Sequence, residues 1–142
     1  MNLQTQTGKA IMGTPARAAA FTKDQARVVL STALNILMKW DASTEQSCNI
    51  LRVSRSTITR ALQGKGVELD VDQLQRASII LNSHAALRLV FDNPENVYGF
   101  PRMENHNDFF NGRTPLEIMA QGDLLSLFET YKRIDALRGG GW

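Results

Sequence analysis

Apolar residues recur at helical spacing along most of the chain, and this pattern predicts an all-α protein. They return every three or four positions in residues 26–40, 74–91 and 124–137. This spacing places apolar side chains on one face of a helix. We therefore expect amphipathic helices that bury one face each, with Trp40 and the apolar residues of 124–137 in the core.

Capping residues mark the ends of these helices. Thr22-Lys23-Asp24-Gln25 has the spacing of a capping box, in which each outer side chain binds the backbone of the other. Asp70 or Asp72 can open the helix that follows, and Asn93-Pro94 ends it. In the last third, Thr114-Pro115 starts a short helix that stops at Gly122, and the next residue, Asp123, caps the final helix.

Residues 43–64 predict two short helices joined by a tight turn. Ser43 or Thr44 can cap the first helix, Ser54 can cap the second, and Gly64 ends it. The side chains expected to face inward are Cys48, Leu51, Val53, Ile58 and Leu62. This is the pattern of a DNA-binding helix-turn-helix, although an ordinary helical hairpin shares the outline.

The second of these helices would read DNA. Its outward side chains are short or basic, so the helix can enter a major groove and donate to phosphates and base edges. The candidate DNA-contacting residues are Ser54, Arg55, Ser56, Thr57, Thr59, Arg60 and Gln63. Arg52 occupies the turn position where glycine is usual, so either Arg52 adopts a positive φ or the turn takes another geometry.

Charge is unevenly distributed along the chain. The net charge of the whole chain is +2, but residues 1–65 carry +6 and residues 66–142 carry −4. A basic front half suits a polyanion such as DNA, although solvated basic faces are common. The charge pattern therefore agrees with DNA binding by the front half.

The last third of the chain carries a more specific pattern. It contains Phe110-Asn111-Gly112-Arg113-Thr114-Pro115-Leu116-Glu117, then Gly122-Asp123, and it ends in Arg138-Gly139-Gly140-Gly141-Trp142. These residues resemble the C-terminal toxin-binding domain of Xre/MbcA/ParS-type antitoxins, except that Phe100-Pro101 stands where a tryptophan-containing segment is expected. The resemblance implies a cognate RES-domain toxin, which consumes NAD or transfers ADP-ribose from it, and repression of the chain's own operon.

The resemblance also implies which residues bind the toxin: Phe110, Arg113, Arg138, Gly139, Gly140, Gly141 and Trp142. The terminal Gly-Gly-Gly-Trp would reach into or across the NAD pocket of the toxin and exclude the nucleotide sterically. Aromatic residues are frequent anchors at protein interfaces. A tail of this kind can equally be loosely docked, because chain termini are often poorly ordered.

We predict three segments. Residues 1–21 form a flexible arm that can include a short helix after Thr14-Pro15, residues 22–91 form a helix-turn-helix DNA-binding domain, and residues 92–142 form the toxin-binding domain. We expect a homodimer, since two-fold operators match two-fold proteins. The alternatives are a transcription regulator whose C-terminal half only dimerises, and an adaptor whose hairpin does not bind DNA.

The chain lacks the motifs of common enzyme classes. It has no paired-histidine helix motif, phosphate-cradling glycine loop, nucleophile elbow or cysteine pair. Cys48 is expected to be a packing residue, His84 a hydrogen-bonded core or interface residue, and His106 a surface residue, so we expect no metal and no cofactor. No apolar run approaches the roughly 20 residues of a membrane span, and we expect a cytoplasmic protein.

Overall fold

The computed structural model describes residues 21–139, and within this range it contains helices and no strand. The elements are α3 (Lys23–Lys39), α4 (Thr44–Leu51), α5 (Arg55–Leu62), α6 (Val71–Val90), α7 (Pro94–Gly99), η2 (Phe100–Arg102), α8 (Pro115–Met119), α9 (Leu124–Ala136) and η3 (Leu137–Gly139). None of these helices has the length and apolar character needed to cross a membrane. The predicted all-α fold is confirmed, whereas the predictions for residues 1–20 and 140–142 lie outside the described range.

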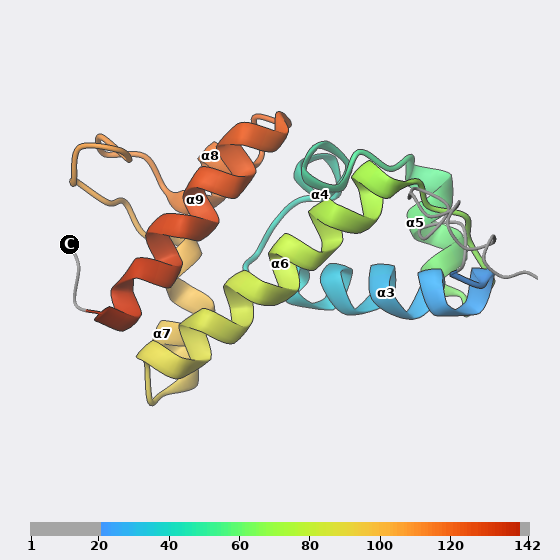
Figure 1. Cartoon of the computed structure of the whole chain (residues 1–142), viewed down its shortest axis with the longest axis horizontal. Helices are drawn as coiled ribbons and strands as arrows, with labels where there is room; N and C mark the ends of the chain where they lie inside the picture. Colours follow the sequence, from blue (N-terminus) through green and yellow to red (C-terminus); the bar gives the residue numbers. More distant parts are fainter. Residues whose placement is uncertain (1–20, 140–142) are drawn as a thin grey trace, which may run out of the picture.

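The long helix α6 is the element against which the others are arranged. Figure 1 shows it running diagonally through the middle of the molecule, with α3, α4 and α5 toward one end and α7, α8 and α9 toward the other. It packs against both α3 and α9. Its buried residues include Leu74, Ala77, Ile80 and Leu87, which recur at helical spacing. One amphipathic helix therefore supplies core to both ends of the molecule.

Side-chain caps fix the starts of the helices at the predicted positions. Thr22, Ser43, Asp70 and Thr114 form reciprocal capping boxes, and Asp123 accepts from a backbone N–H three residues later. Hydrogen bonds from the backbone and the side chain of Ser126 lower the pKa of the Asp123 carboxyl. The sequence left two candidates for each of two caps. Ser43 and Asp70 are the caps, and the other candidates, Thr44 and Asp72, lie inside the helices.

A single apolar cluster joins the two ends. Trp40 is fully buried, as predicted, and belongs to the same cluster as Leu51, Ile80, Leu127 and Ile134. Residues from both the predicted 22–91 segment and the predicted 92–142 segment contribute to it. The candidate sites at the two ends are consequently connected through packed side chains.

Two inward positions of the helix-turn-helix differ from the prediction. Leu62 is 52% exposed, and Ala61 is buried in its place. The Ser31 hydroxyl donates to the Ala61 carbonyl at 3.3 Å, so α3 lies close to α5 and a small side chain fits between them. Cys48 is half-buried, whereas Ser47 is buried because it lies three and four residues before two fully buried positions of α4.

His84 is a half-buried residue of α6 that faces α7. Its ring stacks on Tyr98 with the centroids 5.3 Å apart, and the Lys39 ammonium lies 5.0 Å from the Tyr98 centroid. Its buried Nδ1 has no hydrogen-bond partner among the described residues, so the expected hydrogen bond is absent at that atom. No group of three or more His, Cys, Asp or Glu side chains between residues 21 and 139 is placed to hold a metal ion.

The environment of His84 predicts a loss of stability on acidification. Burial, and then the positive charges of Arg88 and Lys39, lower the pKa of His84 from 6.5. The unfolded chain therefore takes up the proton at a higher pH than the folded chain, so stability is complete above the unfolded pKa and falls as the pH drops toward the folded pKa.

Melting temperatures of the wild type and His84→Gln between about pH 7.5 and about pH 5.5 measure this effect. We expect the wild type to lose more of its melting temperature than the variant across this range. Parallel declines would show that His84 does not contribute to the pH dependence.

Candidate functional site

The turn between α4 and α5 sets the position of the predicted reader helix. Arg52 adopts the left-handed conformation, with φ 56° and ψ 42°, which is the first of the two predicted alternatives. This conformation costs a non-glycine residue roughly 1–2 kcal/mol. The Arg52 carbonyl accepts a 2.8 Å hydrogen bond from Nε2 of Gln73 on α6, and the adjacent Val53 is buried in the core. Packing and this hydrogen bond hold the turn.

Ser54 organises the first turn of α5. Its Oγ accepts from the Thr57 backbone N–H at 3.1 Å and lies 3.0 Å from the hydroxyls of Ser56 and Thr57. The positive end of the helix dipole lies at the same place. This group of hydroxyls and backbone N–H groups is suited to a phosphate of the DNA backbone.

The predicted DNA-contacting residues form the outer face of α5. Six of them are exposed and Thr57 is half-buried. The two arginines differ in their freedom: Nη2 of Arg60 donates to the Gly66 carbonyl at 3.2 Å, whereas Arg55 forms no hydrogen bond or ion pair with any residue in 21–139. Arg55 therefore offers a free guanidinium, and Arg60 also holds the loop that follows α5.

Lys23 is a basic residue of this surface that the sequence reasoning did not identify. It lines a shallow hollow of about 290 Å³ together with Thr57, Arg60 and Gly66. A Cβ added at Gly66 would lie 2.9 Å from the Lys23 Cβ, so a glycine allows the loop to approach the start of α3 this closely. The two segments are far apart in sequence, and no local pattern indicates that they meet.

The predicted partner-binding residues begin in the loop before α8. Phe110 is fully buried and packs edge to face against Phe109, with the centroids 5.0 Å apart. Arg113 is exposed and donates to the carbonyls of Phe110 at 2.9 Å and Phe109 at 3.0 Å. The Arg133 guanidinium lies 4.6 Å from the Phe109 ring centroid. Phe110 anchors the loop from inside, and Arg113 closes it from outside.

The Asn111-Gly112 pair explains part of the sequence motif in this loop. Asn111 has φ 52° and Gly112 has φ 86°, and Asn and Gly adopt such values at the lowest cost. The turn brings the Gly112 N–H within 2.7 Å of the Asn105 carbonyl and the Asn105 N–H within 3.1 Å of the Arg113 carbonyl. The motif therefore encodes a closed loop.

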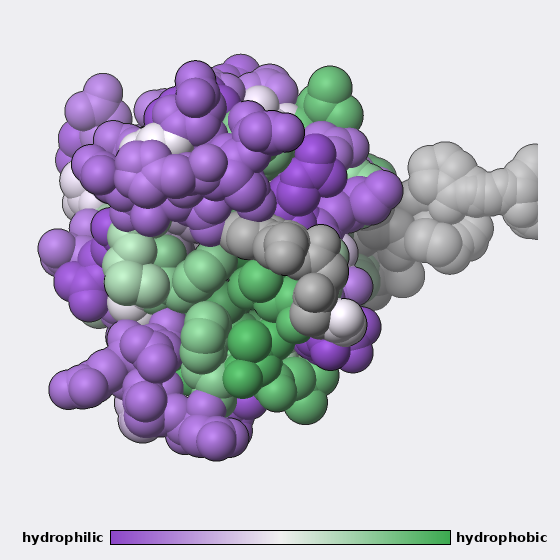
Figure 2. Space-filling model, turned by 90° about the vertical axis from the view of Figure 1, so that its left-hand side faces the viewer, coloured by the Kyte–Doolittle hydropathy of each residue, from purple (hydrophilic) through white to green (hydrophobic). Residues whose placement is uncertain are grey.

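The remaining predicted partner-binding residues lie at the end of the chain. Arg138 is exposed in η3, and its Nε donates to Asp135 at 2.8 Å. Gly139 is the last described residue, so Gly140, Gly141 and Trp142 lie outside the range. The loop before α8 and the C-terminal end of α9 both lie away from α5 in Figure 1. Figure 2 views the molecule from that side and shows an apolar area between two polar regions, which suits a protein partner.

Arg76 of α6 connects the two candidate sites, and the sequence reasoning did not identify it. Its Nη1 donates to the Ile50 carbonyl at 3.2 Å and to the Gly122 carbonyl at 2.8 Å, and its Nε lies 3.0 and 2.9 Å from the two carboxylate oxygens of Asp72. Ile50 lies just before the helix-turn-helix turn, and Gly122 lies between α8 and α9. Arg76 is only 6% exposed.

Arg76→Met should lower the free energy of unfolding by about 2–4 kcal/mol, because two buried carbonyls lose their donor and Asp72 loses its partner. Arg27→Met is the control, since the half-buried Arg27 pairs only with the exposed Asp24 and its removal leaves no buried carbonyl without a donor, so it should cost less than about 1 kcal/mol. Urea denaturation of both variants measures the difference. Equal, small effects would show that the Arg76 hydrogen bonds do not hold the structure together.

Comparisons with known proteins agree with this geometry. Residues 19–82 match the antitoxin Xre-like helix-turn-helix domain, which confirms the predicted helix-turn-helix; its family is regulatory, DNA-binding and non-enzymatic. The chain is also 32% identical over 132 residues to "Uncharacterized protein y4oB" of Sinorhizobium fredii, which covers 91% of this chain and all of that protein. This chain therefore belongs to the same family as the y4oB protein, and its residues 19–82 are similar to the antitoxin Xre-like helix-turn-helix domain.

Proposed function

We propose that this protein is an antitoxin that sterically inhibits a cognate RES-domain toxin and, as a homodimer, represses its own operon by binding operator DNA. The observation that carries the DNA-binding part is the exposed outer face of α5, with a capped N-terminus, a hydroxyl cluster and an Arg55 guanidinium that has no partner among residues 21–139. The identity of the toxin rests on the resemblance of residues 110–117 and 138–142 to toxin-binding domains.

On the DNA side, α5 would lie in the major groove. Arg55 in its first turn can reach a base edge or a phosphate, and the hydroxyls around Ser54 can receive a neighbouring phosphate. Lys65 is exposed near the C-terminal end of the helix and can neutralise a further phosphate. Lys23 is exposed in the same region, and its ammonium, which lies 3.7 Å from the Glu68 carboxylate, would exchange that carboxylate for a phosphate. A second copy would present the same helix to the second half of a two-fold operator.

On the toxin side, inhibition would need no chemistry from this chain. The closed loop held by Phe110 and Arg113 would form a rigid contact surface, and the tail that follows Arg138 would enter or cover the NAD pocket of the toxin. The loop and α5 lie at different ends of the molecule (Figure 1), so operator and toxin can be bound at the same time.

Replacing Arg55 tests the DNA-binding part. We expect Arg55→Ala to weaken operator binding by about 1–3 kcal/mol and to reduce the slope of log affinity against log salt by about one unit if the contact is to a phosphate. Titration of a DNA fragment from upstream of the gene, at several matched salt concentrations, measures both quantities.

Arg88→Ala is the matched control, because it removes the same charge from an exposed position in the last turn of α6. It should leave the affinity nearly unchanged. Equal weakening by both variants would mean that only net charge matters, and unchanged binding by Arg55→Ala would refute the role of Arg55 in reading DNA.

Removing Gly139 to Trp142 tests the toxin-binding part. The truncated chain should bind operator DNA with wild-type affinity, since α5 lies at the other end of the molecule from the C-terminal end of α9 (Figure 1), but should fail to protect cells that express the RES-domain toxin. Growth after toxin induction is the readout, and DNA affinity reports that the truncated protein is folded. Full protection would refute the tail as the inhibitory element and favour a regulator whose C-terminal half has another role.

A further inference from the structure

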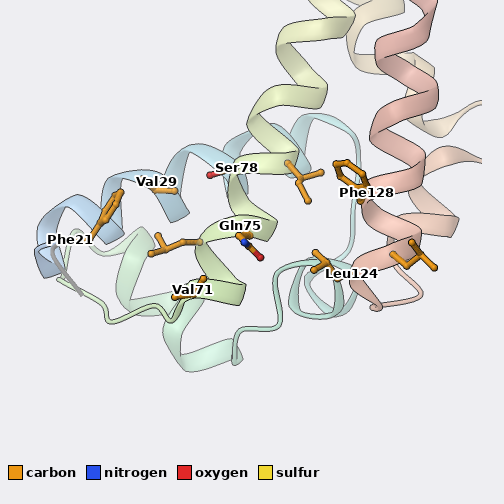
Figure 3. A pocket seen from close by; sticks show the side chains of 10 residues that line it. Phe21, Val29, Val71, Gln75, Ser78, Leu124 and Phe128 are labelled. Atoms are coloured by element: carbon orange, nitrogen blue, oxygen red, sulfur yellow. The ribbon is translucent and has the colours of Figure 1, made fainter. Parts of the chain in front are cut away.

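A groove of about 760 Å³ lies between α3, α6 and α9. Figure 3 shows Val71 on α6 in the middle, Phe21 and Val29 on the α3 side, and Leu124 and Phe128 on the α9 side. The groove therefore has a floor from α6 and a wall from each of the two helices that pack against it. It joins the helix-turn-helix end of the molecule to the C-terminal end.

The walls of the groove carry apolar side chains that the fold leaves exposed. The sequence predicts one continuous buried face on α9, but only part of it is covered: Leu127 is buried, whereas Phe128 is 43% exposed and the neighbouring Leu125 is 67% exposed. Phe21 and Val71 are also exposed. Together these side chains expose on the order of 400 Å², about half of the ~800 Å² that one partner buries in a standard interface.

The charge of the groove restricts what can bind there. None of the ten lining residues is ionisable, and only Gln75 and Ser78 are polar. DNA and acidic segments would find no cation to pair with. A two-fold interface brings identical surfaces together, so a neutral apolar lining avoids the repulsion that repeated like charges would produce. The groove therefore suits a second copy of this chain.

The position of the groove agrees with this occupant. No residue proposed to contact DNA lines it, and neither do Phe110, Arg113, Arg138 or Gly139. A molecule bound in the groove leaves the outer face of α5 and the loop before α8 uncovered. A homodimer partner has to remain in place while operator and toxin bind, and this surface permits it.

We propose that two copies of the chain associate through this groove, with Leu125 and Phe128 of each copy inserted against α6 of the other. The inference rests on the homodimer of the proposed function and assigns its surface. The two hydrophobic side chains lie on the same face of α9, one turn apart or less, and protrude beside the hollow that would receive their counterparts.

Leu125→Asp tests this surface, and Leu89→Asp is the matched control. Leu89 is a helical leucine that is 71% exposed and does not line the groove. Sedimentation equilibrium of the full chain over a range of concentrations gives the dimer dissociation constant. We expect the wild type and Leu89→Asp to dimerise alike, and Leu125→Asp to dimerise at least roughly 30-fold more weakly. Phe128→Asp repeats the test, and circular dichroism confirms folding.

Each contrary outcome has a distinct meaning. A wild-type chain that is monomeric at every concentration refutes the homodimer of the proposed function together with the groove assignment. Wild-type dimerisation by both Leu125→Asp and Phe128→Asp refutes the groove assignment alone. If these variants stay dimeric but no longer bind the toxin, the groove is a toxin contact. Tighter dimerisation after deletion of residues 1–20, unaffected by Leu125→Asp, assigns the groove to that segment and also overturns the proposal.

Discussion

The relative placement of the two candidate sites depends on the buried guanidinium of Arg76. A buried cation is costly unless it is paired and hydrogen-bonded. Asp72 balances the charge of Arg76 and accepts from its Nε, and the carbonyls of Ile50 and Gly122 accept from its Nη1. Movement of α4 or of the α8–α9 turn away from α6 would remove one of the two carbonyl acceptors of this buried guanidinium. The arginine thus ties the end of α4 and the start of α9 to one helix.

Two side chains of α6 also hold the turn between α4 and α5. Gln73 binds the Arg52 carbonyl, and Arg76 binds the carbonyl two residues earlier, so the left-handed Arg52 is kept in place by side chains of α6. The apolar cluster runs without interruption from Trp40 to Ile134. The turn held by α6 and the continuous core together give α5 a fixed direction relative to α9.

The sequence predicts the features that local chemistry determines. The caps at Thr22, Ser54 and Asp123 each place a helix start, because the capping hydrogen bond spans only three residues. It does not predict that Ala61 rather than Leu62 faces α3, or that Arg76 binds carbonyls 26 and 46 residues away. Periodicity identifies the apolar face of a helix, but the tertiary packing decides how much of that face is covered.

Arg55 and Arg60 show why the site requires the structure as well as the motif. Both are exposed arginines of one short helix, and the sequence gives them the same role. Arg60 donates a hydrogen bond to the Gly66 carbonyl, and the loop that contains Gly66 packs closely on α3. Replacing Arg60 therefore alters both a charge and the support of the helix end, whereas replacing Arg55 alters only a charge at the surface. Of these two replacements, only that of Arg55 allows a loss of operator affinity to be interpreted as a lost DNA contact.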